Sequence, residues 1–117
     1  MDQDSFEIDY EGSLILRDAE IRGDIKSDKG IYLKGTVRGR VDSDSRVIVN
    51  NKAVIDGDVE CQELFLDGVI TGNVCVSART VIGGHGVIKG VLVTDTLEVV
   101  PGSVIEGGLR LKKSNNK

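Results

Sequence analysis

Apolar and polar residues alternate over short stretches along most of the chain, and no run is long and periodic enough for a helix. Six of these alternating segments predict short β-strands. They begin at residues 14, 31, 47, 64, 80 and 97, so successive starts lie 17, 16, 17, 16 and 17 residues apart. This regular spacing identifies an internal repeat.

A second element follows each segment: an Ile or Val, any residue, a Gly, any residue, and usually another apolar residue. Its glycines lie 16, 18, 15, 18 and 17 residues apart, and small insertions at 52–53 and 83–86 account for the variation. They are Gly23, Gly39, Gly57, Gly72, Gly90 and Gly107.

A period of 16–17 residues that holds three short strands predicts one turn of a triangular coil. Turns stacked about 4.8 Å apart would form parallel ladders around a filled interior. The fold class is therefore all-β: a single-domain triangular β-helix, or solenoid, of about six turns and roughly 29 Å in length. We expect Val49, Leu66 and Ile82 in one core column, and Ile55, Ile70 and Ile88 in another. The repeat glycines should lie where the chain bends sharply or packs without a Cβ.

Outward residues beside the repeat glycines should stack in rows. The row before the glycines is Arg22, Arg38, Asp56, Thr71, Lys89 and Glu106, and the row after them begins Asp24, Arg40, Asp58 and Asn73. Opposite charges one turn apart attract, so Arg38 over Asp56 and Lys89 over Glu106 favour this stacking. Arg22 over Arg38 opposes it.

Composition supports strands and a single domain. Val and Ile supply 27 of the 117 residues and Ala supplies 3, a balance that excludes a helical bundle. We expect a short tail over 1–13 that includes a partial first rung at 6–10, the β-helix over 14–111, and a disordered polar tail over 112–117.

The charge balance and the cysteines narrow the class of function. A net charge of −4 and 3% aromatic residues argue against a nucleic-acid binder. The sequence has no apolar run of membrane-spanning length, and its acidic N-terminus is unlike a signal peptide. Cys61 and Cys75 lack CxxC spacing and are interpreted as reduced thiols of a cytoplasmic protein that act as small hydrophobes.

The sequence contains no constellation of catalytic residues. His85 is the single histidine, which excludes a three-histidine metal site, and we interpret it as part of a solvated turn. The glycines around it do not form a phosphate loop of the GxxxxGK[ST] type, so we expect no nucleotide, cofactor or metal. Asp56 and Asp58 are interpreted as solvated residues. The alternative from another class is a small acyltransferase-like enzyme that uses His85 as its base.

Six copies of [I/V]-x-G-x-[I/V/L] at this spacing, from about residue 14 to 111, resemble the bactofilin family of bacterial polymer-forming cytoskeletal proteins. The resemblance implies a right-handed β-helix that polymerises without nucleotide into non-polar filaments by joining equivalent ends. It also implies a scaffold for cell-shape, cell-wall or polar-localisation machinery at the cytoplasmic face of the membrane. Some members carry a hydrophobic N-terminal targeting segment, which the acidic leader here does not match, so direct membrane binding is not expected.

The ends of such a coil are its candidate functional site. The first and last turns of a β-helix expose backbone and core, and uncapped ends invite end-to-end joining. The predicted polymerisation interface consists of Ile8, Leu14 and Leu16 at one end and Leu109 and Leu111 at the other. A third hypothesis is a monomeric binding module, in which the tails fold over both ends and a flat face binds a partner.

Overall fold

The computed structural model describes residues 6–8 and 14–112, which form twelve strands in one sheet and no helix. The strands are β1 (Phe6–Ile8), β2 (Leu14–Arg22), β3 (Ile25–Ser27), β4 (Ile31–Arg38), β5 (Val41–Ser43), β6 (Arg46–Val49), β7 (Val54–Asp56), β8 (Val59–Leu66), β9 (Val69–Thr71), β10 (Val74–Ile82), β11 (Val87–Val99) and β12 (Val104–Leu111). Pairing is parallel everywhere except between β1 and β2.

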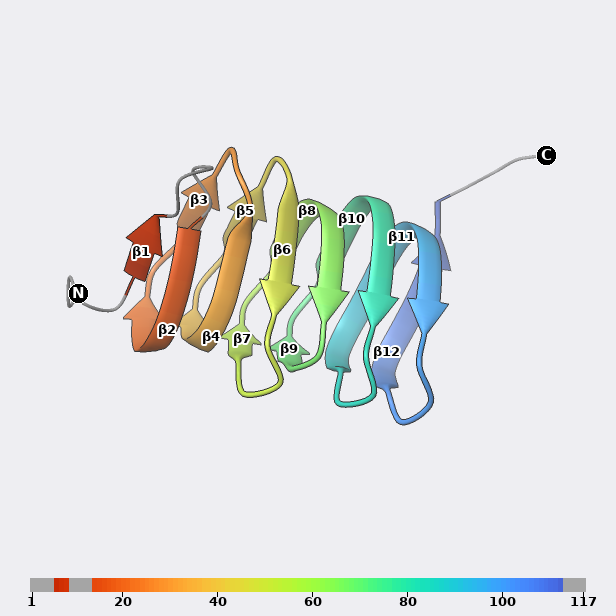
Figure 1. Ribbon diagram of the computed structural model, residues 1–117. Helices are drawn as coiled ribbons and strands as arrows, with labels where there is room; N and C mark the ends of the chain where they lie inside the picture. Colours follow the sequence, from red (N-terminus) through yellow and green to blue (C-terminus); the bar gives the residue numbers. More distant parts are fainter. Residues whose placement is uncertain (1–5, 9–13, 113–117) are drawn as a thin grey trace.

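The strands coil into three flat faces around a common axis (Figure 1). The first face stacks 14–16, 31–33, 47–49, 64–66, 80–82 and 97–99. The second stacks 20–22, 36–38, 54–56, 69–71, 87–89 and 104–106. The third stacks 25–27, 41–43, 59–61, 74–76, 92–94 and 109–111. Long strands bend around corners, so β11 alone contributes to all three faces.

These registers confirm the predicted all-β solenoid. The first face consists of the six segments expected from the alternation, in the expected order. The sequence predicted about six turns; the structure stacks six segments on each face, with five inter-turn steps between them.

Alternate residues of each strand point inward and fill the core. Val49, Leu66 and Ile82 stack in one column and are at most 1% exposed. A second column holds Ile55, Ile70 and Ile88, each 0% exposed.

Two buried threonines interrupt the apolar core near its last turns. The Thr80 hydroxyl donates to Thr94 Oγ1 at 2.9 Å, and the Thr94 hydroxyl donates to the Thr96 carbonyl at 2.9 Å. Both hydroxyls are therefore paired, which offsets the free-energy cost of burying them.

The repeat glycines stack directly on one another at one corner. A Cβ built on Gly57 would lie 2.1 Å from the Gly39 carbonyl oxygen, and one on Gly90 would lie 2.0 Å from that of Gly72. The same backbone takes a positive φ, +155° at Gly57, where side chains are strained. Gly23 has a positive φ as well, but a Cβ there would meet nothing within 4 Å, because it lies in the first turn.

The N-terminal strand differs from the expected partial rung. β1 pairs antiparallel with the start of β2, with Ile8 opposite Leu14 and Phe6 opposite Leu16. An antiparallel strand reverses the chain direction, so it does not add a turn to the coil. It instead covers the first edge of the first face. Residues 9 and 10 of the expected rung lie outside the described residues.

Candidate functional site: the ends of the coil

The last turn exposes side chains that point into the core. Val99, Leu109 and Leu111 are 51%, 47% and 54% exposed. Their register partners one turn earlier are Ile82, Leu92 and Thr94, all 0% exposed. Val99, Leu109 and Leu111 have the same inward orientation as these partners, but no described strand lies over them, so the core ends in an apolar surface. The half-buried Leu97 and Ile105 enlarge it.

The backbone of the last turn is open in the same way. In the described part of the chain, β12 pairs with β11 alone. Its inner edge is fully engaged, as in the bonds from the Val104 amide to the Gly86 carbonyl (2.9 Å) and from the Lys112 amide to the Thr94 carbonyl (2.8 Å). The outer edge presents donors and acceptors that another strand would satisfy.

The first turn is better covered than the last. Ile25, the first inward residue of the third face, is only 8% exposed, and Ile21 is half-buried against the core. β1 already occupies the first edge of the first face. Figure 1 shows β1 at one end of the coil and β12 at the other.

The structure therefore separates the predicted interface residues into two groups. Leu109 and Leu111 lie together on the open end. Ile8, Leu14 and Leu16 lie together at the opposite end through the β1–β2 pairing, and their side chains fall outside the described part. The sequence analysis did not include Val99; its place in the sixth copy of the repeat was the signal that pointed to it.

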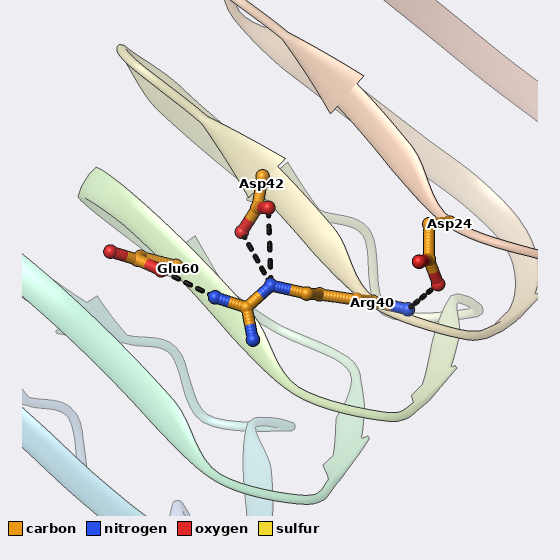
Figure 2. Close-up of polar contacts among 4 residues, drawn as sticks. All are labelled: Asp24, Arg40, Asp42 and Glu60. Carbon is orange, nitrogen blue, oxygen red and sulfur yellow. Dashed lines mark hydrogen bonds and ion pairs between the residues drawn. The ribbon is translucent and has the colours of Figure 1, made fainter.

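The sides of the coil carry a charged network centred on Arg40 (Figure 2). Its Nε donates to both oxygens of Asp42, at 3.0 and 3.1 Å, and one terminal nitrogen lies 2.5 Å from Glu60 Oε1. The hydrogen bond and charge of Asp42, followed by Glu60, raise the pKa of Arg40. The Arg40 backbone amide donates to Asp24 Oδ1 at 3.0 Å.

The outward rows have the predicted register but not the predicted ion pairs. Arg22, Arg38 and Asp56 do stack in order. Within the stretch 14–112, however, Arg38 pairs with Glu20 at 3.0 Å rather than with Asp56, and Lys89 makes no ion pair with Glu106. Glu20 also lies 3.8 Å from Arg22, so it relieves the repulsion between the two stacked arginines.

Asp24 and Asp58 act on the backbone rather than on a cation. Asp58 Oδ1 accepts a hydrogen bond from the Asn73 amide at 3.0 Å, one turn later, as Asp24 does from Arg40. The row after the repeat glycines therefore links successive turns at the corner. Asp56, in contrast, is simply exposed, as the sequence analysis expected.

His85 lies in the turn between β10 and β11. Its side chain is 74% exposed, its amide donates to Asp67 Oδ1 at 3.0 Å, and its Nδ1 lies 3.5 Å from the same oxygen. This contact anchors a surface turn. Over 6–8 and 14–112, no three His, Cys, Asp or Glu side chains gather in a way that could hold a metal ion.

The two cysteines have different surroundings. Cys61 is buried and Cys75 is exposed, and both are free thiols. Burial, followed by the nearby Cys75, raises the pKa of the Cys61 thiol to about 12. Cys61 is therefore protonated and unreactive at neutral pH.

Comparison with known families places this coil. The protein family described as "Bactofilin: Polymer-forming cytoskeletal" matches residues 13–110, which are most of the chain. The chain belongs to the bactofilin family. It is therefore a polymer-forming cytoskeletal protein and a filament-forming scaffold rather than a member of an enzyme family.

Among solved structures, this bactofilin is similar to the Thermus thermophilus bactofilin, which was reconstructed by cryo-EM as double helical filaments. The TM-score is 0.74 and the identity 22%, over 81% of this chain and 97% of that one. At this identity the likeness shows the shared fold. No curated protein matches the sequence. The described residues include no helix that is long and apolar enough to cross a membrane.

Proposed function

We propose that this bactofilin polymerises end to end through its C-terminal turn, without nucleotide, and that joints form between equivalent ends. The observation that carries the proposal is the apolar surface of Val99, Leu109 and Leu111, which point inward and are uncovered. Ile8, Leu14 and Leu16 are proposed for the second joint, at the opposite end.

The size of the open end suits a joint. Its exposed apolar side chains present about 300 Å² per subunit, so two ends bury on the order of 600 Å², or roughly 15 kcal/mol at 25 cal/mol per Å². Association costs of about 4–15 kcal/mol offset much of this. The remainder is consistent with a polymer that forms without an energy source.

A joint between equivalent ends also satisfies the open backbone. A twofold axis across the joint places the outer edges of two last turns against each other in antiparallel orientation. Antiparallel strands also form a regular ladder, so the outer donors and acceptors of both edges can pair across the joint, in the antiparallel hydrogen-bond pattern rather than the parallel one of the coil.

We propose that the subunit has no catalytic residue and needs no cofactor, and that His85 serves only its turn. The filaments would support cell-shape, cell-wall or polar-localisation machinery in the cytoplasm, at the inner face of the membrane, through cell-wall or membrane-associated partner proteins. By analogy with the double helical filaments of the Thermus protein, we propose that filaments of this chain also associate in pairs.

The test substitutes the open end and examines the purified protein, without nucleotide, by negative-stain microscopy and light scattering. Leu111→Arg and Leu109→Arg should each give folded particles of one or two subunits, because a joint would bury two facing positive charges. Thr71→Arg is the control, since it adds the same charge at an exposed site in the middle of the second face.

Long filaments in both leucine variants would place the joint elsewhere, with the end that holds Ile8 and Leu14 the next place to look. Short particles for the wild-type protein would favour the monomeric binding module. His85→Ala should form filaments like the wild type; their loss in a folded variant would reopen the enzyme hypothesis.

A further inference from the structure

One column of outward side chains is apolar along almost the full length of the first face. It consists of Ile15, Tyr32, Ile48, Phe65 and Val81, all half-buried, and we call it the lateral stripe. The register stacks them one above another in five successive turns. The strands β6, β8, β10 and β11 of this face run side by side across the front of Figure 1.

The other faces differ. The central outward column of the third face is Lys26, Asp42, Glu60, Cys75, Val93 and Arg110. The second face has outward valines at 54, 69, 87 and 104 but no aromatic ring in the stretch 14–112, and these valines lie next to the charged row that begins with Arg22 and Arg38. Both aromatic rings of the stretch 14–112, those of Tyr32 and Phe65, lie in the lateral stripe and not in the core. Aromatic side chains are enriched at the centres of protein interfaces.

Charges beside the stripe alternate in sign. Arg46, Glu63 and Arg79 follow one another in register, and the Arg46 guanidinium also lies over the Phe65 ring at 5.3 Å. Within the subunit Arg46 pairs with Glu63 at 3.2 Å, and Arg79 pairs with Glu98, which follows the stripe in the same column. A second copy of this face that runs antiparallel and is shifted by one turn adds a further opposite charge beside each overlapping member of the alternating row, so the face is complementary to itself.

We propose that the lateral stripe is the surface through which two filaments of this chain pair side by side. The inference rests on the proposed filament. The occupant is a second copy because the flanking charges complement the same face. The stripe also runs parallel to the axis, so a polymer presents it again in each subunit.

The small area of this face determines whether single subunits or only whole filaments can pair through it. Six segments spaced about 4.8 Å apart, each three residues of about 3.3 Å, give a face of roughly 300 Å². The stripe side chains are already half-buried, whereas Val99, Leu109 and Leu111 at the open end are 47–54% exposed. One pair of subunits therefore buries less additional apolar surface at the stripe than at an end joint, and two single subunits should not hold together through it. Subunits already joined in filaments make many such contacts at once, and pairing becomes cooperative. The stripe thus acts only after end-to-end assembly.

The experiment compares Val81→Glu with Val93→Glu. Both valines are half-buried and outward, and they lie on the first and third faces. Electron microscopy of the full chain measures filament length and whether filaments are single or paired. Val81→Glu should give filaments of wild-type length that are single, and Val93→Glu should leave them paired.

A milder variant, Ile48→Thr, keeps a strand-forming residue and should reduce the paired fraction without affecting the fold. Paired filaments in both Val81→Glu and Ile48→Thr would overturn the inference, as would wild-type filaments that are only single. A wild type that forms no filaments overturns the proposed end-to-end function itself, which is a different observation from filaments that remain paired. The Leu111→Arg particle should show no side-by-side dimer; a stable lateral dimer there would contradict the area argument.

Discussion

The column of stacked glycines should be the most sensitive feature of the coil, and Gly57→Ala tests it. The added Cβ would lie 2.1 Å from the Gly39 carbonyl oxygen and 2.7 Å from the carbonyl carbon. Both atoms belong to the backbone, so no side chain can rotate away. The two turns must move apart by about 1.5 Å to reach ordinary contact.

That movement acts on hydrogen bonds that hold the same corner. The Gly39 amide donates to the Asp56 carbonyl at 3.0 Å, and the Val41 amide donates to the Asp58 carbonyl at 2.9 Å. Loss of both would cost about 2–4 kcal/mol, and the strained backbone adds about 1–3 kcal/mol. We expect Gly57→Ala to lose at least about 3 kcal/mol, a large part of the stability of an ordinary domain.

Gly23→Ala is the matched control. Gly23 also has a positive φ, +142°, but a Cβ there meets nothing within 4 Å. This variant should lose only the conformational part, about 1–3 kcal/mol. The assay is urea unfolding followed by far-UV circular dichroism, with both changes made in the Leu111→Arg background so that assembly does not shift the midpoint. Equal losses in the two variants would refute the reasoning, since contact between turns would then contribute nothing.

Two further predictions concern the interior. Val49→Asp places a carboxylate where the native side chain is 1% exposed and should cost several kcal/mol, seen as a large fall in melting temperature; a wild-type melting curve would contradict the inward orientation of Val49. Because the pKa of Cys61 is raised to about 12 from an ordinary value of 9.0, its thiol stays protonated in the folded state while that of the unfolded chain ionises. The stability it contributes is therefore fully present below about pH 9 and declines as the pH rises toward 12, by at most about 1.4 kcal/mol per pH unit. Urea unfolding at pH 8 and pH 10 should show this decline in the wild type and less of it in Cys61→Ala; equal declines would assign the effect to other groups.

Much of the fold could be predicted from the sequence because the repeat fixes the register. Once Val49 is assigned inward, the period assigns Leu66 and Ile82, and the outward rows follow. The ion pairs were harder to predict. Glu20 lies beside the stacked arginines rather than in their row, and long side chains reach diagonally to the nearest opposite charge. The actual partners therefore depend on rotamers, which spacing does not encode.

The ends were only partly predictable for a related reason. Leu109 and Leu111 follow the repeat, so their inward orientation could be inferred, and they are exposed because β12 pairs only with β11 among the described strands. β1 does not follow the repeat. Three residues that alternate in polarity are compatible with either chain direction, and only the tertiary structure makes β1 antiparallel to β2.

The corner between the first and second faces accepts loops of different length. It holds two residues between β8 and β9, and four between β6 and β7, between β10 and β11, and between β11 and β12. The stacked strands keep their register on both sides of every loop, so each turn contributes the same height of about 4.8 Å. Subunit length is thus set by the number of copies, independently of the chemistry of the ends. Duplication or loss of one whole copy would change the distance between successive joints by a single step and leave the joints as they are, so such a coil can serve as a ruler whose length evolves in fixed increments.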